Sequence, residues 1–166
     1  MVEFADLQCP FCARFDRDVL PAVVRRFVRP GRLRIELRPI VLLGAASAPA
    51  GAAAVAAGNQ GRMWQFADLF YRNQGPENSG YVTDAFVARV AAAVPGLSPP
   101  RLRRDLPSRA VRSIMIANAR LAYTARVTGT PTFRLGRTNG TLLPFAGRQL
   151  EPQDFVRRLA AAIGGG

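Results

Sequence analysis

The chain has 166 residues, of which 49% are apolar, so its length and composition are those of one globular domain and exclude a largely disordered protein. Its formal charge of +12 comes from 23 basic residues, all of them arginine, which are spread along the chain and not clustered with aromatic residues as nucleic-acid binding requires. The absence of histidine excludes imidazole-based nucleophile pairs and imidazole metal ligands, and two cysteines are too few for a four-thiolate metal site.

The first predicted element is a short strand that runs directly into a helix. Val2, Phe4 and Leu7 are apolar, which is typical of a strand and the turn that follows it. Pro10 suits the first turn of a helix, because the N–H group that proline lacks has no partner there. Cys9 then lies at the N-terminus of the helix, where free backbone N–H groups and the helix dipole favour a thiolate over a thiol.

The two cysteines, Cys9 and Cys12, form a Cys-Pro-Phe-Cys motif at this junction. A thiolate is the nucleophile in disulfide exchange, and a second cysteine three residues on can attack the mixed disulfide and release the product. A structural role is a poor explanation of the pair, because a disulfide between residues this close closes only a small loop. The pair is therefore expected to be redox-active, and the alternatives are half of an intersubunit metal site or an inert pair.

A kinked helix and a second strand are predicted after the motif. Apolar residues recur every four positions over residues 15–27, which indicates one buried helix face, and Pro21 is expected to bend this helix. Apolar and charged residues then alternate from residue 33, which predicts a strand that extends toward residue 43, although Pro39 favours a break. Strand, helix and strand in this order make a βαβ unit whose two strands should be parallel.

The middle of the chain has a helical pattern. The expected helices are an alanine-rich segment at 48–57, a segment with apolar spacing at 63–70, a helix capped by Thr83 that continues to residue 94, a short helix that begins at Pro99-Pro100, and a longer helix that is capped by Ser108 and has Gly129 as its C′ residue. Because strands resume after this block, we interpret residues 47–127 as a helical insertion within one domain.

A β-hairpin and a last helix complete the predicted elements. The hairpin pairs a strand at 130–135, opened by Pro131, with a strand at 142–145, through a turn at Asn139-Gly140. Gly147 is expected to end the second strand. The last helix should begin at Pro152 and bury an apolar face, and the glycine tail at 164–166 is expected to fray.

This order of elements resembles the DsbA-like branch of the thioredoxin superfamily, and the likeness covers nearly the whole chain. Two motifs carry it: residues 3–12, which end in the Cys-Pro-Phe-Cys motif, and residues 129–133, which read Gly-Thr-Pro-Thr-Phe. The resemblance implies an α/β protein with a central mixed sheet, in which a thioredoxin-like domain of residues 1–46 and 128–166 is interrupted by the helical insertion at 47–127. The family usually has a further strand before this point, so the fold prediction allows for a missing N-terminal strand.

The resemblance also implies roles for single residues. Cys9 matches the nucleophile that faces solvent, and Cys12 matches the buried resolving cysteine. Pro131 matches the family's cis-proline beside the two sulfurs, and the backbone of Thr130 is expected to hydrogen-bond a substrate peptide. Glu3 lies six residues before Cys9, as does the family's buried acid, which helps to move the proton of the resolving thiol. The alternative for Glu3 is an ordinary carboxylate at the end of a strand that faces water.

The sequence departs from the family at the two residues between the cysteines, Pro10 and Phe11. Members with histidine there use it to stabilise the nucleophilic thiolate, which Phe11 cannot do. Phe11 is expected instead to present an apolar surface to an unfolded polypeptide, and its alternative is a partly buried helix residue. The loss of the histidine predicts a milder oxidant, and a reductase is not excluded. Asp6, which lies close to Cys9 in sequence, is interpreted as a turn residue.

The leading hypothesis is therefore an enzyme, a thiol–disulfide oxidoreductase that acts on client proteins. It needs no cofactor beyond the redox-active Cys9–Cys12 disulfide and no metal, and its expected partners are cysteine-containing or unfolded clients and a redox protein that recycles it, with no nucleic acid. The alternatives are a non-catalytic thioredoxin-like binding module and a thiol isomerase or transferase that uses glutathione. Disulfide exchange on clients belongs outside the cytoplasm, so we expect an exported or membrane-tethered parent protein in the periplasm or cell envelope, although the sequence shows no signal peptide and a cytoplasmic location is the alternative.

Overall fold

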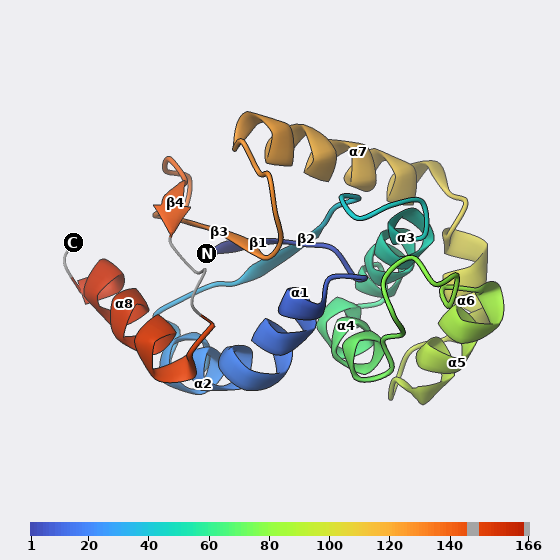
Figure 1. Ribbon diagram of the computed structural model, residues 1–166, viewed down its shortest axis with the longest axis horizontal. Helices are drawn as coiled ribbons and strands as arrows, with labels where there is room; N and C mark the ends of the chain where they lie inside the picture. Colours follow the sequence, from blue (N-terminus) through green and yellow to red (C-terminus); the bar gives the residue numbers. More distant parts are fainter. Residues whose placement is uncertain (146–149, 165–166) are drawn as a thin grey trace.

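A mixed β-sheet runs through the middle of the molecule, with helices on both of its faces (Figure 1). In this computed structural model, which describes residues 1–145 and 150–164, the sheet has four strands in the order β2-β1-β3-β4. The strands are β1 (Val2–Ala5), β2 (Glu36–Pro39), β3 (Thr132–Leu135) and β4 (Leu143–Phe145). β1 pairs with β2 in parallel, and the β1–β3 and β3–β4 pairs are antiparallel. The predicted α/β fold with a central mixed sheet is confirmed.

The helix after β1 contains two π-helical segments. It begins as α1 (Pro10–Arg14), widens at Phe15–Val19, returns to an α-helix as α2 (Leu20–Val23) and widens again at Val24–Val28. Pro21 has no N–H to donate to the carbonyl four residues before it, and just ahead of it the Leu20 N–H donates to the Phe15 carbonyl, five residues back. The bend that Pro21 predicts therefore takes the form of a widened turn.

The second strand is shorter than predicted. Residues 33–43 show the expected alternation, but β2 begins at Glu36 and ends at Pro39. At the start, the Leu33 N–H donates to the carbonyl of Phe27 at 3.0 Å, so this residue belongs to the end of the preceding helix. At the other end, the N–H groups of residues 42 and 43 donate to the carboxylate of Asp6, which turns the chain away from the sheet.

Five helices separate β2 from β3 along the chain. They are α3 (Ser47–Gly58), α4 (Met63–Arg72), α5 (Asp84–Ala93), α6 (Pro99–Asp105) and α7 (Arg109–Thr124). The two predicted N-caps are confirmed, because the Thr83 hydroxyl accepts from the N–H of residue 86 and the Ser108 hydroxyl accepts from the N–H of residue 111. The division of the chain into a thioredoxin-like domain and an insertion at 47–127 stays an interpretation.

The end of α7 differs from the prediction. The helix stops at Thr124, and the residue in the left-handed conformation is Arg126, with a φ of 52°, and not Gly129. The N–H of Arg126 donates to the carbonyl of Tyr123, and the N–H of Val127 donates to the carbonyl of Ala122. This pair of bonds closes the helix in the way of a Schellman motif, so the predicted C′ glycine is wrong.

The hairpin and the last helix form as predicted. Asn139 has a φ of 63° in the turn between β3 and β4, a conformation that asparagine tolerates better than most residues. The last helix, α8 (Pro152–Gly164), buries an apolar face. Gly164 is its final residue, so the tail that was expected to fray does not begin at this position. Gly147 and the other two tail glycines, at positions 165 and 166, lie outside the described residues.

The side chains of β1 alternate between two differently packed faces of the sheet. Val2 and Phe4 are buried on the face that α7 covers. Glu3 points to the opposite face, because successive side chains of a strand alternate. On that face Phe15 packs against β3 and α8, with its ring centroid 4.6 Å from that of Phe133. The sheet thus places one carboxyl group beneath the helix that carries the two cysteines.

Candidate active site

Cys9 is the N-cap residue of α1, at the junction that the sequence predicts. Its backbone N–H donates to the carbonyl of Asp6 at 3.0 Å, which closes the turn between β1 and α1. Its thiol donates to the carbonyl of Thr130 at 3.2 Å, so the first turn of the helix lies against the segment that leads into β3. Only 4% of Cys9 is exposed, so the expectation that this residue faces solvent is wrong. Both cysteines are free thiols.

The surroundings of Cys9 favour its thiolate. A hydrogen bond from the Cys12 side chain is the largest of the effects that lower its pKa to about 6, although burial acts in the opposite direction. The backbone N–H groups of Phe11 and Cys12, at the N-terminus of the helix, also lower this pKa. The helix N-terminus therefore stabilises the thiolate as expected, even without a histidine in the motif.

Cys12 has the opposite environment. It is fully buried in the first turn of α1, and this burial raises the pKa of its thiol well above the usual range. The hydrogen bond that it donates to Cys9 and the nearby charges of Cys9 and Glu3 raise this pKa further. The two sulfurs of one motif are thus held in different states, one ready to ionise and the other kept protonated.

Glu3 is buried beneath the two cysteines. Only 2% of it is exposed, so the alternative of a carboxylate that faces water is wrong. Burial is the largest cause that raises its pKa well above the usual range, and the charges of Asp16 and Cys9 add to it. A buried carboxyl group that is easily protonated can take up a proton from a neighbouring thiol.

An apolar groove lies beside Cys9, at the Thr130–Pro131 peptide bond, which is cis. It has a volume of about 530 Å³, and we call it the cis-proline groove; its lining includes Phe11, Thr130, Pro131, Phe133, Phe145 and Leu150. Phe11 is 59% exposed at its rim, so the alternative of a partly buried helix residue is wrong for this side chain. Pro10, the first residue of α1, is also exposed.

The carboxylate of Asp6 holds the turn before Cys9, which confirms its interpretation as a turn residue. Its carboxylate accepts hydrogen bonds from the backbone N–H groups of Gln8 at 2.9 Å, Leu42 at 2.8 Å and Leu43 at 3.0 Å. Three donors of this kind stabilise a buried carboxylate without a cation. The same carboxylate ties the turn before Cys9 to the segment that follows β2.

Gln8 anchors the same turn from its other side, a role that the sequence does not reveal. Its side-chain amide is buried and donates to the hydroxyl of Ser47 at 2.9 Å, and its carbonyl oxygen accepts from the backbone N–H of Asn78 at 3.1 Å. No sequence signal points to these partners, because they lie 39 and 70 residues away along the chain.

Asp16 is a third buried acid, which the sequence analysis did not single out. It is 7% exposed, and burial together with the neighbouring Asp68 raises its pKa to about 7. A signal for it exists in the sequence, since it lies four residues after Cys12 and therefore on the same face of the helix. Tyr71, on α4, is buried nearby, and its hydroxyl has no hydrogen-bond partner among the described residues.

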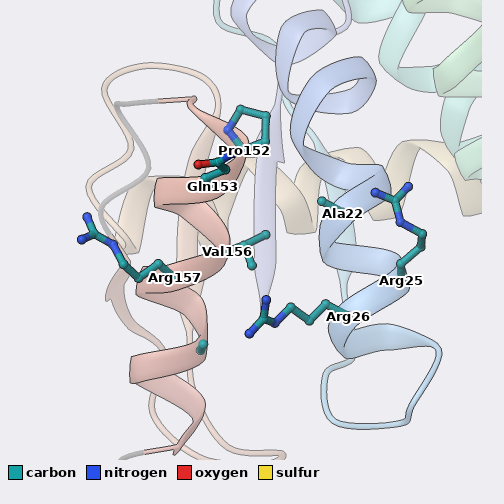
Figure 2. A pocket seen from close by; sticks show the side chains of 8 residues that line it. Ala22, Arg25, Arg26, Pro152, Gln153, Val156 and Arg157 are labelled. Atoms are coloured by element: carbon teal, nitrogen blue, oxygen red, sulfur yellow. The ribbon is translucent and has the colours of Figure 1, made fainter.

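Away from the cysteines, arginines line a groove between the helix of residues 20–28 and α8 (Figure 2). Its lining includes Arg25, Arg26, Arg157 and the apolar Val156, and its volume is about 520 Å³. Arg157 is paired with Asp154 at 2.5 Å. The described residues that line this groove include no aromatic side chain on which a base could stack. That the chain binds no nucleic acid stays a prediction.

Over residues 1–145 and 150–164, the structure brings together no group of three or more potential metal ligands from cysteine, aspartate and glutamate. In the same part of the chain, no helix is long and apolar enough to cross a membrane.

Comparison with known proteins agrees with this geometry. The sequence model of a family described as thioredoxin matches residues 1–142. The chain is also similar to the probable disulfide bond formation protein D of Bacillus cereus, with 26% identity over 135 residues that cover 80% of this chain and 62% of that protein. It thus spans less than two thirds of the length of the curated relatives it matches.

Two solved structures share the fold. BdbD from Bacillus subtilis, in its oxidised form, has a TM-score of 0.81 and 20% identity, with 99% of this chain and 86% of that chain covered. The cytosolic disulfide reductase DsbM from Pseudomonas aeruginosa has a TM-score of 0.78 and 17% identity, with 99% of this chain and 98% of that chain covered. At these identities, the likeness bears on the fold alone.

Proposed function

We propose a function from the premise that this chain belongs to the thioredoxin family: it is a thiol–disulfide oxidoreductase that exchanges disulfides with the cysteines of client proteins. One observation carries the proposal. Cys9 lies at a helix N-terminus beside the cis-proline groove, while Cys12 is buried directly behind it. A client sulfur can approach the first thiol from the groove, and the second is shielded from competing reactions.

In this mechanism Cys9 forms the bond to the client and Cys12 breaks it. The Cys9 thiolate attacks a client disulfide, and one client sulfur leaves as a thiolate. Cys12 then loses its proton to Glu3 and attacks the Cys9 sulfur, which forms the Cys9–Cys12 disulfide and releases the second client sulfur. The reverse sequence oxidises a client dithiol and leaves Cys9 and Cys12 reduced.

The groove is the proposed site of the client polypeptide. The exposed ring of Phe11, with Pro10 beside it, offers an apolar contact for an unfolded segment. The backbone of Thr130 is available to hydrogen-bond an extended peptide, and Pro131 takes the role of the family's cis-proline next to the reacting sulfurs. A groove that recognises apolar surface and backbone suits many different clients.

The pKa of Cys9 bears on the direction of exchange. A lower pKa of the attacking cysteine stabilises the reduced protein and makes its disulfide more oxidising; this pKa is about 7 in thioredoxin and about 3.5 in DsbA. The value of about 6 for Cys9 lies between them. We therefore propose a milder oxidant than the histidine-containing members, and leave the reductase direction as the alternative.

The remaining parts of the proposal follow from the chemistry. The redox-active Cys9–Cys12 disulfide serves in place of a separate cofactor, and a second redox protein recycles it. Because clients that keep disulfides are found outside the cytoplasm, the parent protein is placed in the periplasm or cell envelope, tethered to the membrane or free. The cytoplasm is the alternative, and a cytosolic reductase shares this fold.

Two other functions compete with this one. A binding module would use the cis-proline groove without chemistry at the cysteines, and a thiol isomerase or transferase would use glutathione as its second thiol. The difference between the two thiols favours the oxidoreductase, because a binding module has no need of one cysteine that ionises readily and another that stays protonated.

A trapping experiment tests the proposal. Cys12→Ser should accumulate a mixed disulfide through Cys9 when it meets a peptide that contains a disulfide, and Cys9→Ser should accumulate none; mass spectrometry under non-reducing conditions measures both. The wild-type protein should complete the exchange and release the reduced peptide. If Cys12→Ser forms no mixed disulfide, the chain is a binding module. If exchange proceeds only with glutathione present, it is the transferase.

A further inference from the structure

A second group of titratable side chains lies behind the cysteines, on three different elements. Asp16 follows Cys12 by four residues, so the carboxyl and the thiol share one face of the helix. α4 packs against this helix and contributes Tyr71 and Asp68, and β1 contributes Glu3 from below. The mechanism above uses Cys12 and Glu3 and assigns nothing to the other three.

Asp16 and Asp68 line the same groove. Burial is the largest cause that raises the pKa of Asp16 to about 7, and the neighbouring carboxyl group of Asp68 raises it further. Two carboxyl groups this close do not ionise together readily, so near neutral pH the pair holds one proton. The pair also spans the boundary between interior and solvent. Asp16 is buried. The Asp68 side chain is 39% exposed, and its carboxylate forms an ion pair with Arg72 at 2.8 Å.

A groove opens on the solvent side of this pair. It has a volume of about 670 Å³, and its lining includes Asp16, Asp68, Arg72, Trp64 and Gln65. We call it the carboxyl groove. A proton held by the pair therefore has a direct exit to water, on a different side of the helix from the cis-proline groove.

The inner side of the pair leads toward the cysteines. The buried hydroxyl of Tyr71 has no hydrogen-bond partner among the described residues, although a buried hydroxyl normally has one. Tyr71 belongs to the same buried cluster as Cys12. Burial raises the pKa of its hydroxyl well above the usual range, and the charges of Cys12, Glu3 and Asp16 raise it further. A hydroxyl can accept a proton from one neighbour and donate its own to another.

We propose that Asp16, in its proton-sharing pair with Asp68, is a positioning residue that connects Glu3 and Cys12 to solvent through the hydroxyl of Tyr71. The inference rests on the proposed function. When Cys12 attacks the mixed disulfide, its proton passes to the carboxylate of Glu3. Glu3 returns it by way of Tyr71 to the Asp16–Asp68 pair, and the pair releases it into the carboxyl groove. When the protein oxidises a client, the same route carries a proton inward to Cys12.

The charges around Asp16 define the pH range of this route. Glu3 faces it from β1, Asp68, Tyr71 and Arg72 face it from α4, and Arg17 and the two cysteines lie on its own helix. Burial and Asp68 keep the proton on the pair into the neutral range, and the two arginines oppose them. Release of the proton from the pair, and with it the resolving step, should therefore depend on pH around neutrality.

The experiment measures the lifetime of the mixed disulfide across pH 5–9. Reduced protein is mixed with a disulfide peptide for a single turnover, quenched with acid and analysed by mass spectrometry. Asp16→Asn should leave the formation of the mixed disulfide unchanged. It should slow the resolution at least about tenfold near pH 7, as expected for a lost proton-transfer group, and flatten its pH profile. Asp16→Glu should restore the profile in part.

Two further variants make the test specific. Asp18 lies on the same helix, is exposed and pairs with Arg14 at 3.9 Å, so Asp18→Asn is the matched control and should resolve as the wild type does. Asp68→Asn changes a half-exposed residue and should fold normally. It should keep the pH dependence but move its midpoint to lower pH, because the second carboxyl no longer holds the shared proton. This variant also tests the proposal if Asp16→Asn does not fold.

The outcomes separate this inference from the proposed function. If Asp16→Asn resolves with the rate and pH profile of the wild type, or if Asp18→Asn is slowed equally, the proton route is wrong while the oxidoreductase stands. An unchanged midpoint in Asp68→Asn also overturns it. If the wild-type protein forms no mixed disulfide at any pH, the proposed function itself is wrong.

Discussion

At the scale of single residues, the two cysteines of one motif differ because each meets a different part of the fold. Backbone N–H groups at the start of α1 and the side chain of Cys12 favour the thiolate of Cys9. Cys12 is one turn further into the helix and is fully buried in an apolar cluster, where burial and the nearby charge of Glu3 favour its thiol. Disulfide exchange needs one thiol that ionises readily and attacks first, and a second thiol that stays protonated until it resolves the mixed disulfide. The N-terminus of α1 provides both within four residues.

A substitution at Phe11 tests how the motif sets the redox potential. Titration of the thiolate absorbance near 240 nm should give a midpoint at about 6 for wild-type Cys9. In Phe11→His the imidazolium adds a positive charge beside the sulfur, and the midpoint should fall by about one unit, which corresponds to about 30 mV toward a more oxidising disulfide. Phe11→Leu is the control and should titrate like the wild type. Equal midpoints in the two variants would contradict this account.

At the scale of elements, three phenylalanines hold the active-site helix, the sheet and α8 together. Phe15 follows the Cys-Pro-Phe-Cys motif by three residues, and its ring centroid lies 4.6 Å from that of Phe133 on β3 and 5.3 Å from that of Phe155 on α8. All three rings are fully or almost fully buried. The position of the cysteines relative to the sheet therefore depends on this aromatic cluster.

Removal of one ring from the aromatic cluster should strongly lower the free energy of unfolding. Phe15→Ala is expected to lower the free energy of unfolding by ~3–5 kcal/mol, through lost transfer energy and a cavity that the neighbouring rings cannot fill. Phe11→Ala removes the same side chain from the surface and should change it by less than about 0.5 kcal/mol. Urea unfolding of the reduced proteins, followed by circular dichroism, measures both. Similar losses in the two variants would show that Phe15 does not anchor the helix.

The sequence predicts those elements whose signals are local. The motif at Cys9, the caps at Thr83 and Ser108, and the turn at Asn139 each depend on a few neighbouring residues, and all form as predicted. The prediction failed at Gly129, because the helix could close earlier, on Arg126. Contacts between segments that are distant along the chain were also not predicted from the sequence.

The ends of β2 and the buried acids illustrate such distant contacts. β2 ends where the carboxylate of Asp6 captures two backbone N–H groups more than 30 residues away. Asp16 is buried because α4 covers it, and its partner Asp68 lies 52 positions further along the chain. Periodicity reveals which side of a helix is covered, but it does not say which residue of which other helix will cover it.

At the scale of the whole molecule, a strongly basic chain buries three of its eleven acidic residues. The formal charge is +12, yet Glu3, Asp6 and Asp16 are buried, and two of these have raised pKa values. The folded protein therefore holds protons that the unfolded chain would release in mildly acidic solution. By linkage, Glu3 and Asp16 contribute stability that is present at low pH and is lost as pH rises through their folded pKa values, whereas the lowered pKa values of Glu36 and Asp154 act in the opposite direction.

This linkage predicts a pH dependence of stability that one substitution reduces. Between about pH 4 and pH 7 the free energy of unfolding of the oxidised protein should fall, because Asp16 binds a proton in the folded state up to a pKa of about 7 and loses it near 3.8 when unfolded. Asp16→Asn should be more stable than the wild type by ~1–3 kcal/mol at pH 8 and similar to it near pH 4.

The oxidised form is used because it has no Cys9 thiol. In the reduced protein the lowered pKa of Cys9 acts with the opposite sign, and stabilises the fold as pH rises from about 6 toward 9. Thermal or urea unfolding at several pH values gives the comparison. If the free energies of unfolding of the wild type and Asp16→Asn change equally with pH across this range, the pKa of Asp16 is not raised in the folded protein.

The carboxyl groove also contains a natural fluorescent probe. Trp64 lines it together with Asp16 and Asp68, and it is the only tryptophan of the chain. Indole emission responds to the ionisation of nearby carboxyl groups. All of the tryptophan fluorescence of this protein therefore originates beside the carboxyl pair. A simple emission scan, without any attached dye, can follow the ionisation of that pair while the cysteines react at the cis-proline groove.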